Sequence, residues 1–223
     1  MGHPIFAAVY ERLSGLAERG FMSEVRRELI GPAAGRVIEI GAGTGLSFPH
    51  YGAAARRVVA IEPDPHMLAR AGRRAAGRGD DLVELRQLEA ERLPFADDSF
   101  DTAISSLTLC TVASPPAALA ELRRVLRPGG TLRFYEHVRS EGRLGARGQD
   151  AVTPLWRRLA GGCHPNRDTV AEIERAGFRV TFLERSRVGP PVPPTAVVRP
   201  HVLGIAEVDG HPSPHDPEET HDS

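Results

Sequence analysis

The chain contains no lysine, and all of its 28 basic residues are arginine. This absence excludes a Schiff-base lysine, the lysine of a phosphate-binding loop and a lysine general base. The 28 basic residues are balanced by 29 acidic ones, so the net charge is -1. Such a balance argues against a nucleic-acid-binding protein that works through a broad basic surface.

Cysteine and long apolar runs are also scarce. The two cysteines, Cys110 and Cys163, are too few for a disulfide framework. The first ten residues lack the basic start and apolar run of a signal peptide, and no apolar run approaches the length of a membrane span. We therefore expect a soluble, cytoplasmic protein without a membrane anchor. Its 223 residues suit one compact domain.

Strands and helices alternate along the body of the chain. Apolar residues at helical spacing predict a helical segment within residues 1–32, followed by one domain over 33–208 and a disordered acidic, histidine-containing tail over 209–223. Apolar runs predict strands near residues 37–40, 58–61, 82–88, 102–109, 131–135, 179–183 and 201–208. Helices are predicted near residues 67–76, 117–126, 152–159 and 167–176, with a turn at 127–130 and a proline-rich loop at 189–200. This alternation implies right-handed crossovers and a mostly parallel sheet covered on both faces, which is a doubly wound α/β fold.

The segment from Glu39 to Gly45 (EIGAGTG) is a glycine-rich turn that follows a strand and is expected to open a helix. Glycines allow the backbone to turn tightly and to approach a ligand, as a nucleotide-binding turn requires. A dinucleotide fingerprint needs its third glycine three residues after the second, where this chain has Leu46. The spacing therefore disfavours an NAD-dependent oxidoreductase. An acid at position 39 also suits a cationic ligand such as S-adenosylmethionine better than a pyrophosphate.

Two further markers follow the turn. Glu62 lies at the end of the second predicted strand, 19 residues after Gly43. A carboxylate there can accept hydrogen bonds from both hydroxyls of a ribose, although NAD enzymes place an acid similarly. The second marker is the run from Glu89 to Asp101 (EAERLPFADDSFD), which connects the third and fourth predicted strands.

Together with Glu62–Leu68 and Leu122–Gly130, these motifs resemble the class I S-adenosylmethionine-dependent methyltransferases over residues 36 to about 137. The resemblance implies a Rossmann-like, seven-stranded sheet that is parallel except for its last strand. It also implies S-adenosyl-L-methionine as the cofactor and S-adenosyl-L-homocysteine as the product. The cofactor-binding residues that it implies are Glu39, Gly41, Ala42, Gly43, Gly45, Glu62, Pro63, Met67, Glu89, Ala90 and Leu107. Of these, Met67 is explained equally well by core packing on a helix.

The second half of the chain resembles the methyltransferase-like proteins related to the alkyl thiol methyltransferases, to about residue 208. The segments that carry this resemblance are Leu107–Val112, Phe134–Val138, Trp156, Gly161–Cys163 and Arg199–Gly204. Animal members begin with an apolar membrane anchor, whereas this chain begins with a polar amphipathic segment. The resemblance implies a small-molecule methyl acceptor, with a thiol as the first hypothesis. N- or C-methylation of a lipid, quinone or other metabolite is the alternative, and a non-catalytic cofactor-binding module stays open.

A thiol acceptor, with a pKa of about 8.5, is only slightly ionised at neutral pH, so a nearby base would help. His137 follows the fifth predicted strand, where such sheets bind ligands, and among the nine histidines it alone is expected at this edge. It is our candidate catalytic residue, although a loop histidine that only fills space is the alternative. Cys110 and Trp156 are candidate substrate contacts. A small buried apolar side chain explains Cys110 better, and a core anchor explains Trp156 equally well. Cys163-His164 has no second pair at ligand spacing, so no metal is expected.

Overall fold

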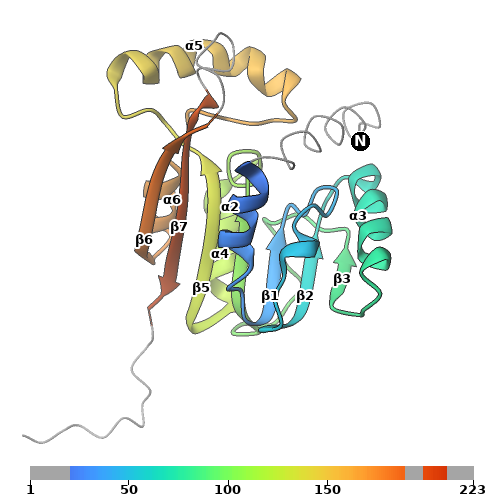
Figure 1. Cartoon of the computed structure of the whole chain (residues 1–223). Helices are drawn as coiled ribbons and strands as arrows, with labels where there is room; N and C mark the ends of the chain where they lie inside the picture. The colour runs from blue at the N-terminus through green and yellow to red at the C-terminus, as the bar shows by residue number, and fades with distance from the viewer. Residues whose placement is uncertain (1–20, 189–197, 210–223) are drawn as a thin grey trace, which may run out of the picture.

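A computed structural model describes residues 21–188 and 198–209 of the chain (Figure 1). The helices are α2 (Phe21–Ile30), α3 (Pro65–Arg78), α4 (Pro115–Val125), α5 (Arg143–Leu159) and α6 (Thr169–Arg175), with a short 3₁₀ helix η1 (Phe48–His50). The strands are β1 (Gly35–Ile40), β2 (Ala55–Ile61), β3 (Val83–Arg86), β4 (Phe100–Ser106), β5 (Leu126–His137), β6 (Phe178–Arg187) and β7 (Pro200–Val208). Residues 1–20 of the predicted helical segment, most of the proline-rich loop and the tail from residue 210 lie outside the described residues.

The seven strands form one sheet in the order β3-β2-β1-β4-β5-β7-β6. Neighbours from β3 to β5 pair in parallel, and β7 pairs antiparallel with both β5 and β6. The prediction of a mostly parallel sheet whose last strand is antiparallel is therefore confirmed. The chain winds outward through β2 and β3 and then returns to β4 on the other side of β1. This reversal creates the crevice beyond the carboxyl ends of β1 and β4 in which open α/β sheets bind ligands.

Helices cover both faces of the sheet (Figure 1). On one face, α2, η1 and α3 bury residues such as Leu29 and Phe48. On the other face, α4 and α6 bury residues such as Leu122 and Ile173. The buried residues of α4 recur at helical spacing and form one apolar side, which packs against the sheet. The doubly wound arrangement expected from the alternating pattern is thus present, and its two apolar clusters hold the strand ends in place.

Local residues set the ends of the helices that border the crevice. Asp64 caps α3, because its carboxylate accepts hydrogen bonds from the backbone N–H groups of His66 and Met67, and Pro65 occupies the first helical position. Ser114 caps α4 in the same manner through the N–H of Ala117. These caps fix where each strand-to-helix loop ends.

Several boundary predictions are wrong. Strand β4 ends at Ser106 and not at residue 109, and β6 extends to Arg187 and not to residue 183. The glycine turn does not open an α-helix but only η1, because glycines at φ +57° and +79° leave the helical region and Pro49 follows. Residues 127–130 are part of β5, which begins directly after α4. Helix α5 begins at Arg143, nine residues before its predicted start. The apolar pattern missed its first part because Leu144 is exposed and two glycines interrupt the apolar spacing.

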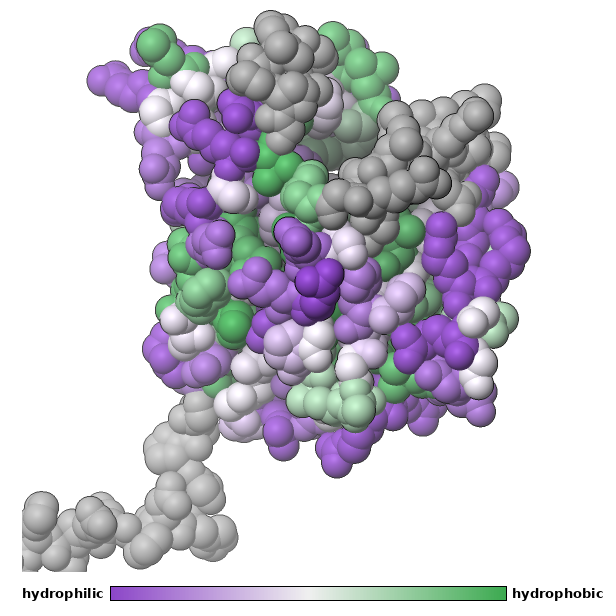
Figure 2. All heavy atoms as spheres, viewed as in Figure 1, coloured by the Kyte–Doolittle hydropathy of each residue, from purple (hydrophilic) through white to green (hydrophobic). Residues whose placement is uncertain are grey.

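Helix α5 lies across the carboxyl end of β5 (Figure 1) and exposes Leu144, Leu155 and Leu159. Figure 2 shows hydrophilic side chains over much of the viewed surface and hydrophobic atoms at this end of the molecule. In the part of the chain that the structure describes, no helix combines the length and the apolar character needed to cross a membrane.

Candidate active site

The glycine turn lies where β1 ends, and its glycines serve different purposes. At Gly41, with φ +61°, a Cβ atom would stand 2.3 Å from the Thr108 hydroxyl oxygen. At Gly43, with φ +57°, a Cβ would find nothing closer than 4.0 Å. Gly45 packs against the ring of Phe48. The first glycine therefore lets β1 and the loop after β4 approach each other, and the second leaves open space beside the backbone.

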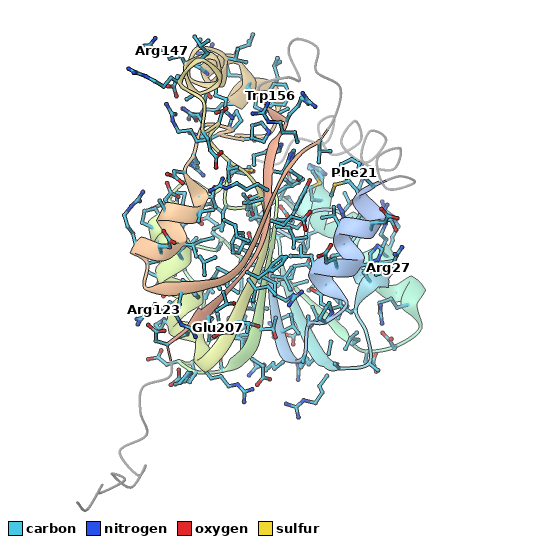
Figure 3. All side chains as sticks on the ribbon, turned by 60° about the vertical axis from the view of Figure 1, so that its left-hand side comes forward. Phe21, Arg27, Arg123, Arg147, Trp156 and Glu207 are labelled. Carbon is cyan, nitrogen blue, oxygen red and sulfur yellow. The ribbon has the colours of Figure 1, made fainter. Side chains whose placement is uncertain are left out.

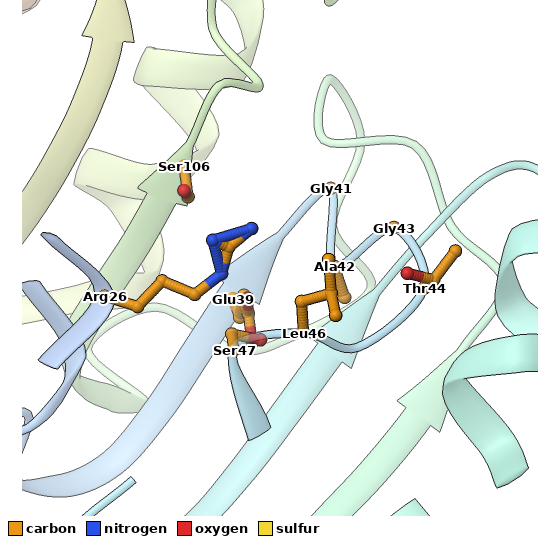
Figure 4. Close-up of a pocket in the computed structure, with 9 residues that line it drawn as sticks. All are labelled: Arg26, Glu39, Gly41, Ala42, Gly43, Thr44, Leu46, Ser47 and Ser106. Atoms are coloured by element: carbon orange, nitrogen blue, oxygen red, sulfur yellow. The ribbon is translucent and has the colours of Figure 1, made fainter. Parts of the chain in front are cut away.

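A pocket opens at this turn, between the ends of β1 and β4 (Figure 4). Its lining residues are Arg26, Glu39, Gly41, Ala42, Gly43, Thr44, Leu46, Ser47 and Ser106. Four of them, at positions 39 and 41–43, are among the predicted cofactor-binding residues. The other predicted ones do not line it, and the remaining five lining residues were not predicted: Arg26, Thr44, Leu46, Ser47 and Ser106.

Two opposite charges are buried at the pocket. Glu39 is 2% exposed and accepts a hydrogen bond from the Tyr51 hydroxyl at 2.9 Å. Burial raises the pKa of Glu39, while the Tyr51 hydroxyl and the positive charge of Arg26 oppose that shift. Arg26 extends from α2 across the end of β1 (Figure 4) and is 7% exposed. The sequence carried a signal for it, since Arg26 occupies a position where the helical spacing of Met22 and Leu29 calls for an apolar residue.

Glu62 links the end of β2 to the glycine turn. Its two carboxylate oxygens accept hydrogen bonds from the backbone N–H groups of Gly43 and Asp64, each at 2.9 Å. Burial raises the pKa of Glu62, and these two hydrogen bonds counteract the shift. Each oxygen keeps a second lone-pair site, so the carboxylate can still accept hydrogen bonds from two hydroxyls.

The remaining predicted cofactor residues surround this position with different exposures. Met67 and Ala90 are buried, whereas Pro63 and Glu89 are exposed. Met67 is one of the two buried residues of α3, so its burial fits both the cofactor contact and the packing alternative. Leu107 is half-buried and has a φ of +57°, in the left-handed region that residues with a Cβ rarely adopt.

Glu136 was not predicted, yet it organises the loop after β4. One oxygen accepts hydrogen bonds from the Ser105 hydroxyl and from the N–H groups of Thr108 and Leu109, at 2.7, 2.9 and 3.0 Å. The other oxygen accepts from the N–H of Cys110 at 3.2 Å. The side chain is fully buried, and burial raises the pKa of Glu136 against the effect of these donors. An acid inside a buried strand was the signal available in the sequence.

Two cysteines and a histidine meet beyond the ends of β4 and β5. The Sγ atoms of Cys110 and Cys163 lie 3.7 Å apart, and the Nδ1 atom of His137 lies 3.6 Å from the first and 3.7 Å from the second. We call these residues the Cys–His–Cys cluster. The Cys110 thiol, and next His137, lower the pKa of Cys163. Trp156, half-buried on α5 (Figure 3), is a smaller cause of the same shift in the pKa of Cys163.

The cluster joins three segments that are far apart in the sequence, separated by 27 and 26 residues. This distance explains why the sequence predicted no metal and assigned Cys163 no role, whereas Cys110, His137 and Trp156 were candidates singly. A second histidine also lies at this edge, contrary to expectation. His201 on β7 pairs with His137, and the two ring centroids are 4.3 Å apart. Burial lowers the pKa of His201 to about 3.

Comparison with known proteins places this chain in a family. A methyltransferase domain model matches residues 38–134. The chain is 35% identical over 186 residues to thiol S-methyltransferase TMT1B of Homo sapiens, covering 78% of this chain and 72% of that protein. It is 31% identical over 215 residues to thiol S-methyltransferase TMT1A of Homo sapiens, covering 90% and 82%. The chain belongs to the TMT1 family of methyltransferases.

The fold agrees with this membership. The TMT1-family chain aligns with a solved geranyl diphosphate methyltransferase in complex with GPP and sinefungin at a TM-score of 0.64 and 18% identity, covering 83% of this chain and 76% of that chain. At such identity the likeness shows the fold alone, so the activity follows from the family. The protein is an S-adenosylmethionine-dependent methyltransferase.

Proposed function

We propose that this methyltransferase transfers the methyl group of S-adenosylmethionine to the sulfur of a small thiol. The observation that carries the proposal is the match to two thiol S-methyltransferases across 78% and 90% of the chain. The Cys–His–Cys cluster supports it, because it lies at the carboxyl edge of the sheet where an acceptor has to be ionised. We further propose that residues 33–208 form the methyltransferase domain, to which the preceding helical segment adds Arg26, and that the enzyme works in the cytoplasm, where thiols stay reduced.

The pocket fits the methionine part of the cofactor. Gly43 presents open space, and the buried hydroxyl of Thr44 has no hydrogen-bond partner among the described residues. Glu39 offers a carboxylate for an amino group, and Arg26 offers a guanidinium for a carboxylate. Glu62, between Gly43 and Asp64, would hold the ribose hydroxyls.

Along the same crevice, the adenine would lie between the end of β2 and the end of β3. Pro63 and Met67 would contact one side of it and Glu89-Ala90 the edge with the amino group. Gly41, Ala42, Gly45 and Leu107 would shape the backbone around the sulfonium. When bound, the cofactor supplies an activated methyl group with a good leaving group.

The protein then has to align the acceptor with the methyl group and exclude water, which supplies roughly 7–11 kcal/mol of the barrier in well-oriented reactions. His137 is half-buried and directs Nδ1 at both cluster sulfurs, so it would act on the acceptor sulfur at this edge of the sheet. Trp156 would cover the acceptor from α5, and Cys110 would contact it.

Transfer of a labelled methyl group tests the acceptor class. The full chain is incubated with labelled S-adenosylmethionine and, separately, with a small alkyl thiol, an amine, a phenol and a quinol. We expect label in the thioether product, and inhibition by S-adenosylhomocysteine. Label in the amine or quinol product with none in the thioether would overturn the thiol assignment.

Replacing Arg26 tests the cofactor pocket. Arg26→Met removes the buried positive charge, and we expect the affinity for S-adenosylhomocysteine to fall about 10–100-fold, the equivalent of a charge-assisted hydrogen bond. Isothermal titration calorimetry measures the change. Arg27→Met is the matched control, since Arg27 lies on the same helix and is exposed (Figure 3). Equal affinities of the two variants would show that Arg26 does not contact the cofactor.

A further inference from the structure

The three donor atoms of the Cys–His–Cys cluster form a nearly equilateral triangle. Its sides are 3.6, 3.7 and 3.7 Å, between Sγ of Cys110, Sγ of Cys163 and Nδ1 of His137. All three ligand atoms lie within 4.8 Å of one another. Both thiols are buried, at 1% and 6% exposure, whereas His137 is half-buried.

These lengths are those of three corners of a zinc tetrahedron. Zinc binds thiolate sulfur at about 2.3 Å and imidazole nitrogen at about 2.0 Å, which puts two sulfurs about 3.8 Å apart and a sulfur about 3.6 Å from the nitrogen. The observed sides agree with both values. Two soft thiolates and an imidazole are a donor set that zinc favours.

The backbone holds each ligand in place. Cys110 is fixed by the hydrogen bond from its N–H to Glu136 and by its carbonyl, which accepts from the N–H of the residue after Cys163 at 2.7 Å. The carbonyl of His137 accepts a hydrogen bond from the Thr169 hydroxyl at 3.3 Å. A site held in this manner before the ion binds loses little freedom on binding.

We propose that Cys110, His137 and Cys163 bind one zinc ion and leave its fourth position open for the sulfur of the acceptor. Three protein ligands with an open position distinguish catalytic zinc sites from structural ones, which are closed by four. The role of the open position rests on the proposed thiol acceptor, whereas the site itself rests on the geometry alone.

Coordination would ionise the acceptor at neutral pH, since a thiol bound to zinc is deprotonated. In the transfer, the acceptor S–H bond breaks and its proton leaves to solvent. The sulfur then forms a bond to the methyl carbon, and the bond from that carbon to the sulfonium sulfur breaks. The products are a neutral thioether, S-adenosylhomocysteine and one proton, and no oxidant or reductant is needed.

Metal analysis tests the site. The full chain is reconstituted with zinc, desalted and analysed by mass spectrometry for metals, and we expect about one zinc per chain. Cys163→Ser and His137→Gln each remove a ligand. Loss of a residue that only hydrogen-bonds to a ligand lowers metal affinity about 10–100-fold, so the zinc affinity of these two variants is expected to fall further than that. The matched control, His66→Gln on the exposed side of α3, is expected to keep its zinc.

X-ray absorption of the wild-type protein gives a result that does not depend on the folding of a variant. We expect two sulfurs at about 2.3 Å and one nitrogen at about 2.0 Å from zinc. A wild-type chain that retains no zinc, or a folded Cys163→Ser variant that binds zinc as tightly as the wild type, overturns the site.

Cobalt in place of zinc tests the open position. We expect the cobalt protein to show a thiolate-to-cobalt charge-transfer band, and a small alkyl thiol to strengthen it, whereas an alkyl amine of the same size leaves it unchanged. An unchanged band together with thiol methylation overturns the metal's role and leaves the proposed function standing. A strengthened band without thiol methylation supports the site and overturns the proposed function instead.

Discussion

Replacing Glu136 with alanine is expected to lower the free energy of unfolding by about 4 kcal/mol, which places it among the most damaging single substitutions. The carboxylate accepts four hydrogen bonds in a fully buried position, three of them from backbone N–H groups in the loop from Thr108 to Cys110. Alanine leaves those donors without an acceptor and opens a cavity. Chemical denaturation followed by circular dichroism measures the loss.

The matched control is Glu184→Ala, because Glu184 is an exposed glutamate on β6. It is expected to change stability by no more than about 0.5 kcal/mol, as surface substitutions usually do. Glu136→Gln keeps the size of the side chain and one acceptor oxygen, but it turns an amide donor towards the N–H of Cys110. We expect this variant to fold and to bind zinc more weakly. If Glu136→Ala is as stable as the control, Glu136 does not hold the loop.

Replacing Gly41 with alanine is expected to lower cofactor affinity by at least about 100-fold, or about 2.7 kcal/mol. The new Cβ would stand 2.3–2.9 Å from the side-chain atoms of Thr108, and a φ of +61° disfavours alanine before any contact is counted. The end of β1 and the loop after β4 must then separate, which deforms the pocket that both of them line. Calorimetry with S-adenosylhomocysteine measures the affinity.

Two other glycines separate the causes of this effect. Gly77→Ala on α3 adds a Cβ with nothing within 4 Å, so it should leave cofactor binding unchanged. Gly43→Ala also avoids a clash but fills the open space beside the turn, and it is expected to fold and still to weaken binding. Unchanged binding in both Gly41→Ala and Gly43→Ala would contradict the assignment of this turn to the cofactor.

The fold could be predicted to a large extent because its signals are local. The run Val58–Ile61, and the run Val37–Ile40 apart from Glu39, are apolar because helices bury both faces of the sheet, and the helix 117–126 has an apolar side at regular spacing. The predictions failed where glycine and an exposed leucine disturb the pattern, at the turn after β1 and at the start of α5. The structure at these two places depends on backbone dihedrals and on packing against other elements, and the spacing of apolar residues reports neither.

The residues of the candidate site also fall into two groups, those that the sequence could predict and those that it could not. The glycine turn and Glu62 could be found because their spacing along the chain is itself the signal. Arg26 and Glu136 are buried charges whose partners come from other elements, so only the packed structure shows what they contact. The Cys–His–Cys cluster is the extreme case. Cys110 follows β4, His137 ends β5 and Cys163 follows α5, and the three meet only in the packed structure.

A crystal structure of the full chain with S-adenosylhomocysteine would test the arrangement of cofactor and acceptor most directly. We expect the ribose hydroxyls to bind Glu62, the amino and carboxylate groups to lie between Glu39 and Arg26, and the thioether sulfur to face the Cys–His–Cys cluster. Such a structure would join the cofactor pocket and the Cys–His–Cys cluster into one reaction site. A ligand bound with its sulfur directed away from the cluster, or bound elsewhere on the chain, would contradict that conclusion.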